Sequence, residues 1–130
     1  MLAHSRVTTV LPVVDVDRAR RFYEEKLGMT GGEPRPYGGV AYRLHGDSTI
    51  ELSPRNEPTK NQYTAASFEV ESVEREVQDL EGRGVRFEDY DMADLKTVNH
   101  VARFGEEKAA WFKDPEGNIL CIHEGSPSTH

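Results

Sequence analysis

The sequence contains one strand–helix pattern twice, 57 residues apart. The first copy, VTTVLPVVDVDRARRFYEEKLG, begins with alternating apolar residues, which predict a strand. Asp15 is a suitable N-cap for the helix that follows, and Gly28 ends that helix. The second copy, YTAASFEVESVEREVQDLEGRGV, has the same order, with Ser72 as the N-cap and Gly84 at the end. The repeat predicts two copies of one structural unit.

Shorter extended segments follow each predicted helix. After the first helix they are 40–44 and 49–53, and after the second they are 85–87, 109–113 and 119–123. The stretch GGEPRPYGG and the polar connection 89–107 are expected to be loops, and SPRNEPTKNQ joins the two halves. The second half therefore has the order βαβββ, and by the repeat we predict an α+β fold with one βαβββ module in residues 1–57 and a second in residues 58–130.

Composition narrows the functions that such a domain can have. Lys and Arg total 16 against 23 Asp and Glu, a net charge of −7, and this balance argues against nucleic acid as a partner. No apolar run reaches the roughly 20 residues of a membrane helix, so no membrane partner is expected. The single cysteine allows no intrachain disulfide, which makes the cytoplasm the expected location.

Two stretches, VDVDRARRFYEEKLGM and AAWFKDPEGNILCIHE, resemble the vicinal oxygen chelate superfamily of glyoxalase I, extradiol dioxygenases and the fosfomycin- and bleomycin-resistance proteins. The resemblance covers nearly the whole chain. It implies that each half forms a curved mixed sheet and that two halves face each other to enclose a cup. It also implies a homodimer with sites at the interface, as in the bleomycin-resistance branch.

The metal-dependent members take one metal ligand from each of four strands. The resemblance puts those positions at Thr8, Glu51, Ala65 and Cys121. Alanine has no donor atom and a neutral threonine is a poor ligand, so we expect no metal and no other cofactor. A site built instead from His4, His45 or His100 has no spacing pattern to support it.

Strand alternation predicts which side chains line the cup. Ile50, Leu52, Leu120 and Ile122 are expected to pack under the helices, which turns their neighbours toward the cup. The expected cup residues are Thr8, Ala41, Arg43, Glu51, Ala65, Ser67, Trp111, Cys121 and His123.

A three-residue hairpin loop at 115–117 pairs Phe112 with Leu120 and places Trp111 opposite Cys121. The same argument places Ala41 opposite Glu51. It also makes Arg43 a diagonal neighbour of Glu51 on the cup side.

Several of these residues allow both a structural and a functional interpretation. Cys121 is a nucleophile, a metal ligand or a small thiol that lines the cup, and the last agrees best with the usual behaviour of free cysteine. Trp111 either stacks on a ligand or fills a shared core. Glu51 is either neutralised by Arg43 or acts as a ligand anchor or general base. His123 is a polar lining residue, an interface residue or a base.

The predicted function is metal-independent binding and sequestration of an aromatic or hydrophobic small molecule, such as an antibiotic or another natural product. No residue is assigned a catalytic role. The alternative is an enzyme. It would be either a glyoxalase- or dioxygenase-like protein with an unusual ligand set, or a metal-free lyase or isomerase that uses Glu51 as its base.

Overall fold

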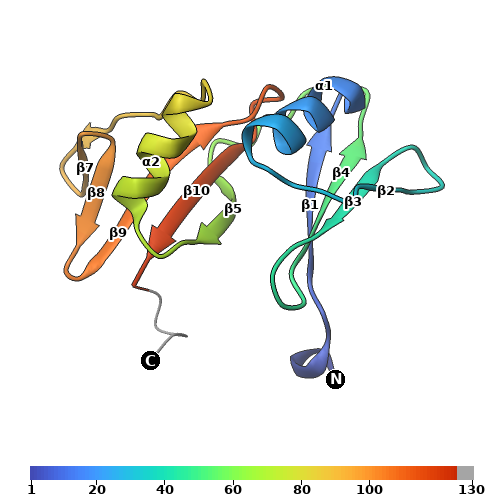
Figure 1. Ribbon diagram of the computed structural model, residues 1–130, viewed down its shortest axis with the longest axis horizontal. Coiled ribbons are helices and arrows are strands. Elements are labelled where there is room, and N and C mark those ends of the chain that lie inside the picture. Colours follow the sequence, from blue (N-terminus) through green and yellow to red (C-terminus); the bar gives the residue numbers. More distant parts are fainter. Residues whose placement is uncertain (126–130) are drawn as a thin grey trace. The chain divides into compact units, whose positions relative to one another are not determined.

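The structure is a computed structural model that describes residues 1–125 and divides into two units. The first unit is Met1–Lys60 together with the turn Pro115–Asn118. The second is Asn61–Asp114 together with the described part of Ile119–His130. Each unit has its own sheet, and Figure 1 labels both α-helices and all strands except β6.

The first unit has a four-stranded sheet in the order β1-β4-β3-β2. Strands β1 and β4 are parallel, and the other neighbours are antiparallel. Its elements are the 3₁₀ turn η1 (Leu2–His4), β1 (Thr8–Val13), α1 (Val16–Arg21), the π-helical turn η2 (Phe22–Lys26), β2 (Glu33–Pro34), β3 (Val40–Arg43) and β4 (Thr49–Pro54).

Helix α1 begins where the sequence predicts it. The Asp15 side chain accepts a hydrogen bond from the Arg18 backbone N–H at 3.0 Å, so Asp15 is the N-cap. Gly28 has φ of +76°, the left-handed conformation expected where the helical segment stops. Ala19 and Tyr23 are fully buried, as are Leu11 and Leu52 of the sheet. The alternation in β1 and β4 therefore has its apolar side in the core.

The turn Pro115–Asn118 packs in the first unit, where Glu116 accepts several hydrogen bonds. One carboxylate oxygen of Glu116 accepts from the Val14 N–H at 2.6 Å, and the other accepts from the Asp15 N–H at 3.1 Å and from Arg18 Nη2 at 2.9 Å. Asn118 Nδ2 donates to the carbonyl of Pro12 at 2.9 Å. The turn sequence DPEGN therefore holds the junction between β1 and α1.

The second unit has a six-stranded sheet in the order β5-β10-β9-β8-β7-β6, with β5 and β10 parallel. Its elements are β5 (Thr64–Glu69), α2 (Val73–Gly82), β6 (Asp91–Met92), β7 (Leu95–Val98), β8 (Val101–Phe104), β9 (Glu107–Lys113) and β10 (Ile119–Glu124). Helix α2 packs against β9 and β10 and buries Val73, Val77 and Leu80, the apolar residues at helical spacing in the second copy.

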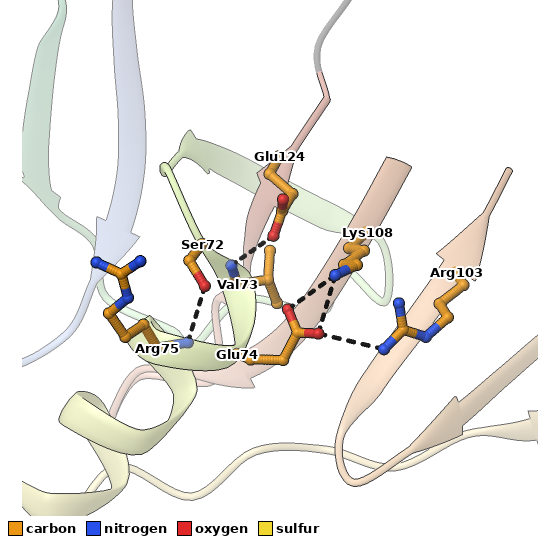
Figure 2. A network of polar contacts seen from close by, with 7 residues as sticks. All are labelled: Ser72, Val73, Glu74, Arg75, Arg103, Lys108 and Glu124. Atoms are coloured by element: carbon orange, nitrogen blue, oxygen red, sulfur yellow. Dashed lines mark hydrogen bonds and ion pairs between the residues drawn. The ribbon is translucent and has the colours of Figure 1, made fainter. Parts of the chain in front are cut away.

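Figure 2 shows how polar contacts fix the start of α2. Ser72 accepts from the Arg75 N–H at 3.3 Å and is the predicted N-cap. Glu124 at the end of β10 accepts from the Val73 N–H at 2.7 Å, which satisfies a further free donor at this helix end. Glu74 then binds Lys108 Nζ at 2.9 Å and Arg103 Nη2 at 3.2 Å. These ion pairs connect the first turn of α2 to β9 and β8.

Most of the predicted register is confirmed. Phe112 pairs with Leu120, Trp111 with Cys121, and Ala41 with Glu51. The internal repeat also extends to strand pairing, because Val10 pairs with Glu51 in the first sheet and Ser67 pairs with Cys121 in the second. Val10 and Ser67 are themselves 57 residues apart.

Three local predictions were wrong. The stretch 89–107 is not a simple loop, because it contains β6, β7 and β8. Residues 85–87 form no strand: Val85 and Phe87 are buried, but Phe87 makes only an isolated bridge to Phe112. The flexible stretch before β3 contributes β2, a two-residue strand.

Candidate ligand-binding site

Trp111 is the centre of the candidate site. It lies on β9, is half-buried, and its indole Nε1 donates a hydrogen bond to Thr64 Oγ1 at 3.1 Å. The Tyr90 ring meets the indole at nearly a right angle, with ring centroids 5.5 Å apart and an interplanar angle of 88°. Edge-to-face packing of this kind stabilises the pair and fixes the orientation of both rings.

These two rings are part of the wall of a cavity of about 520 Å³ that lies within the second unit. We call it the aromatic groove. Apolar and aromatic side chains make up most of its lining. The full set is Gln62, Tyr63, Thr64, Tyr90, Met92, Asp94, Leu95, Phe104, Trp111 and Ile119. The volume falls in the range of small-molecule sites, and the mixture of apolar walls with a few polar groups is typical of them.

The sequence pointed to Trp111 but not to four other large side chains of this wall. Tyr90, Met92, Leu95 and Phe104 come from the segment predicted to be a polar connection. Strands β6 and β7 have two and four residues, which is too short for a reliable alternation pattern. The available signal was the presence of isolated large apolar residues in an otherwise polar stretch.

Cys121 is buried beneath this wall, with 5% of its surface exposed. Burial raises the pKa of its thiol, although hydrogen bonds from Ser67 and from the Ala110 backbone act in the opposite direction. Its Sγ lies 3.4 Å from the carbonyl oxygen of Ile122. A buried protonated thiol of this kind is a poor nucleophile, so the geometry favours a structural role as a small buried residue.

His123 has its hydrogen-bond partner on the neighbouring strand. Its Nδ1 lies 2.6 Å from Ser67 Oγ, on the neighbouring strand β5. Ser67 is exposed and His123 is half-buried, so this polar pair lies at the surface of the sheet. Ala65 lies at a break in the β5–β10 register, where Thr64 pairs with Ile119 and Ala66 with Leu120.

In the first unit, Glu51 has partners that the sequence did not suggest. Its carboxylate lies 3.8 Å from Arg35 Nε, and only 15% of its side chain is exposed. Its hydrogen bond with the Tyr37 hydroxyl is the main cause that raises the pKa of Tyr37. Arg43 is exposed and pairs in register with Thr49, and within residues 1–125 it forms no ion pair. The proposed neutralisation of Glu51 by Arg43 is therefore replaced by contacts with Arg35 and Tyr37.

The donor positions implied by the resemblance do not fit a divalent metal. In the first unit Thr8 is an exposed residue paired with Thr49, and Glu51 is held by Arg35. In the second unit Ala65 has no donor, and Cys121 carries a thiol whose raised pKa opposes the thiolate that a metal requires. No group of three His, Cys, Asp or Glu side chains suited to a metal occurs in the part of the chain that the structure describes.

None of the helices between residues 1 and 125 is both long enough and apolar enough to span a bilayer.

Comparison with known proteins gives a consistent family assignment. The model of the Glyoxalase/Bleomycin resistance protein/Dioxygenase superfamily matches residues 5–122. The uncharacterised protein YurT of Bacillus subtilis (strain 168) is 27% identical over 131 residues, which cover 89% of this chain and 95% of YurT.

Solved structures share the fold at low sequence identity. Lactoylglutathione lyase from Agrobacterium tumefaciens has a TM-score of 0.69 and 18% identity, and the match covers 94% of each chain. The genomically encoded fosfomycin resistance protein FosX from Listeria monocytogenes has a TM-score of 0.65 and 15% identity, with 95% of each chain covered. At these identities the likeness concerns the fold alone.

Proposed function

Because the chain belongs to the Glyoxalase/Bleomycin resistance protein/Dioxygenase superfamily, we propose that it binds and sequesters an aromatic or hydrophobic small molecule without a metal. The ligand class would be that of antibiotics and related natural products. The observation that carries the proposal is the aromatic groove, in which Trp111 and Tyr90 present their rings at a right angle beside a cavity of about 520 Å³.

Two features of the groove and one of the fold support binding of such a ligand. Trp111 is held in place by Thr64 and Tyr90 before any ligand arrives, which reduces the entropy lost on binding. Tyr63, Met92 and Phe104 line the same cavity while 80%, 53% and 46% of their surfaces are exposed, so ligand binding would remove apolar surface from water. The fold is also that of a fosfomycin resistance protein, although this likeness is one of architecture.

The test uses the single tryptophan of the chain as a reporter. Purified protein would be titrated with a panel of aromatic natural products, with tryptophan quenching and thermal stabilisation as readouts. A ligand present at about 100 times its Kd should stabilise the folded state by about 2.7 kcal/mol. If no member of the panel changes either readout, the proposal fails.

Matched variants would locate the binding. Tyr90→Leu removes one ring of the groove and should weaken binding about tenfold, since an aromatic contact contributes up to about 1.5 kcal/mol beyond its buried area. Val98→Ala, at an exposed position of the second unit outside the groove, should leave the affinity unchanged. Equal effects of the two variants would place the ligand elsewhere.

Sequestration is separated from catalysis by the fate of the ligand. Mass spectrometry of the ligand recovered after incubation should show it unaltered. A changed product formed by metal-free protein and lost in Glu51→Gln would favour the lyase or isomerase alternative. The contacts of Glu51 with Arg35 and Tyr37 argue against that outcome, because both partners compete with a substrate for the carboxylate oxygens.

The proposal also includes a homodimer, in which two copies of the chain associate. The support is the exposure of three valines at the edge strand β1: Val10 lies within it, and Val7 and Val14 lie directly before and after it. Sedimentation velocity should detect a dimer, and Val10→Lys should weaken it while Val98→Lys does not. A monomer at all concentrations would remove the second copy from the proposal.

A further inference from the structure

The charge of the aromatic groove is set by one side chain. Among the residues that line it, Asp94 alone carries a formal charge at neutral pH. Asp94 lies in the turn between β6 and β7 and is exposed. Within the described chain its carboxylate has neither a hydrogen-bond donor nor a cation as a partner. The groove therefore presents an uncompensated negative charge beside apolar walls.

The aromatic rings that line the groove also favour a positively charged ligand. Because Trp111 and Tyr90 meet at 88°, the pair forms a corner that can present the face of each ring to one ligand group. The face of an aromatic ring carries the negative part of its quadrupole and attracts cations, most strongly for tryptophan. Tyr63 and Phe104 add two further rings to the wall.

No positively charged side chain in the lining offsets the negative charge of Asp94 and of the ring faces. Lys113 lies two residues from Trp111 on β9, but its Nζ is 3.4 Å from Glu88 Oε1, and it does not line the groove. The net charge of the chain is −7, so the long-range field also favours the approach of cations. An anionic ligand would meet Asp94 and four ring faces without any cationic partner.

We propose that the aromatic groove selects an organic cation with a planar aromatic body. The aromatic body lies against Trp111 and the apolar wall, and the positive charge lies between the Trp111–Tyr90 corner and Asp94. This inference depends on the proposed function, because it names the ligand class of the same site.

The experiment compares three ligands of one shape at pH 7.5. They are N-methylacridinium, which is a cation, acridine, which is neutral at this pH, and 9-acridinecarboxylate, which is an anion. Affinities would be measured by isothermal titration calorimetry, with quenching of Trp111 to show that binding occurs at the groove. The cation should bind about tenfold more tightly than acridine at low salt, and the anion should bind more weakly than both.

Two pairs of variants separate the contribution of the Asp94 charge from that of the Tyr90 ring. Asp94→Asn should reduce the preference for the cation about threefold, whereas Asp91→Asn, on β6 outside the lining, should not change it. Tyr90→Leu should weaken binding of the cation more than binding of neutral acridine. Tyr90→Phe keeps the ring face, so it should keep the preference for the cation. Circular dichroism and melting curves would confirm that each variant is folded.

The outcomes distinguish this inference from the proposed function. Equal affinity for the cation and for acridine, with no effect of Asp94→Asn, would overturn the inference and leave sequestration of aromatic molecules standing. Tighter binding of the anion would overturn it as well. If none of the three acridines binds but neutral natural products still stabilise the protein, the preference for cations is rejected. Sequestration of aromatic molecules then still stands. Failure of every aromatic ligand would reject both proposals.

Discussion

Trp111 on β9 donates its indole hydrogen to Thr64 Oγ1 on β5, although β10 lies between these two strands. The indole therefore crosses β10. Cys121 is the β10 residue that pairs with Trp111, and its small side chain is buried. This geometry explains why a small residue occupies position 121, because a larger one would compete with the ring for the same space.

The Thr64 hydroxyl is expected to fix the ring rather than to stabilise the fold. Thr64→Val keeps the shape of the side chain but removes the acceptor. It should weaken binding of N-methylacridinium about threefold to fivefold, in line with the roughly 1 kcal/mol of one hydrogen bond. Thr64→Ser keeps a hydroxyl and should retain most of the affinity. Equal losses in the two variants would show that the hydrogen bond does not matter for binding.

Cys121 is expected to be unreactive in the folded protein. Its burial and raised pKa leave little thiolate near neutral pH. Alkylation by iodoacetamide at pH 8 should be much slower in native protein than in urea-unfolded protein, followed by mass spectrometry. Rapid labelling of the native thiol would contradict this account and restore a nucleophilic role for Cys121.

Removal of the Glu116 carboxylate should destabilise the first unit strongly. Glu116→Ala removes the carboxylate that accepts from the Val14 and Asp15 N–H groups and from Arg18 Nη2, and we expect a loss of about 3 kcal/mol in the free energy of unfolding. Urea denaturation would measure it. Glu57→Ala, at an exposed loop position, is the control and should change stability by less than about 0.5 kcal/mol.

The same carboxylate predicts an acid-sensitive contribution to stability. Burial raises the pKa of Glu116, but hydrogen bonds from Val14, Arg18 and Asp15 lower it, and the net result lies below its ordinary value of 4.5. A folded-state pKa below the unfolded one stabilises the protein above about pH 5, and this contribution is lost as the pH falls toward the folded pKa. Glu116→Ala should therefore have a flatter stability profile between about pH 6 and pH 3. A parallel profile in the variant would refute the assignment.

Gly39 is expected to tolerate no side chain. A Cβ atom at this position would lie 2.5 Å from the Leu52 carbonyl oxygen and 3.0 Å from the Tyr37 ring. Gly39→Ala should cost about 1–3 kcal/mol, as other overpacked substitutions do. Gly82→Ala lies at the end of α2, where the new Cβ would meet no atom within 4 Å apart from the neighbouring residues and backbone of its own helix. It should be neutral or stabilising by up to about 1 kcal/mol. Thermal melting compares the two directly.

The sequence predicted the parts of the fold that have a clear period. Both helix N-caps, Asp15 and Ser72, were correct because a cap and an apolar stripe form a local signal. The pairing of Trp111 with Cys121 was correct because a short hairpin loop fixes the register.

The contacts that the sequence did not predict come from segments without a regular hydrophobic period. Strand alternation identifies neighbours within a sheet, so it suggested Arg43 for Glu51, whereas Arg35 reaches Glu51 from the loop after β2. Tyr90 reaches Trp111 from the segment before the two-residue strand β6. Each of these contacts depends on how an irregular segment folds back, which local patterns do not specify.

The position of Glu116 in the chain also has a consequence for the order of folding. Its hydrogen-bond partners Val14 and Asp15 are separated from it by 102 and 101 residues. A ribosome that makes about 5–20 residues per second finishes the first β-strand and helix several seconds before it adds the turn that contains Glu116. The first strand and helix therefore emerge with the Asp15 cap but without the Glu116 carboxylate, and they reach their full stability only after residues 115–118 have been translated.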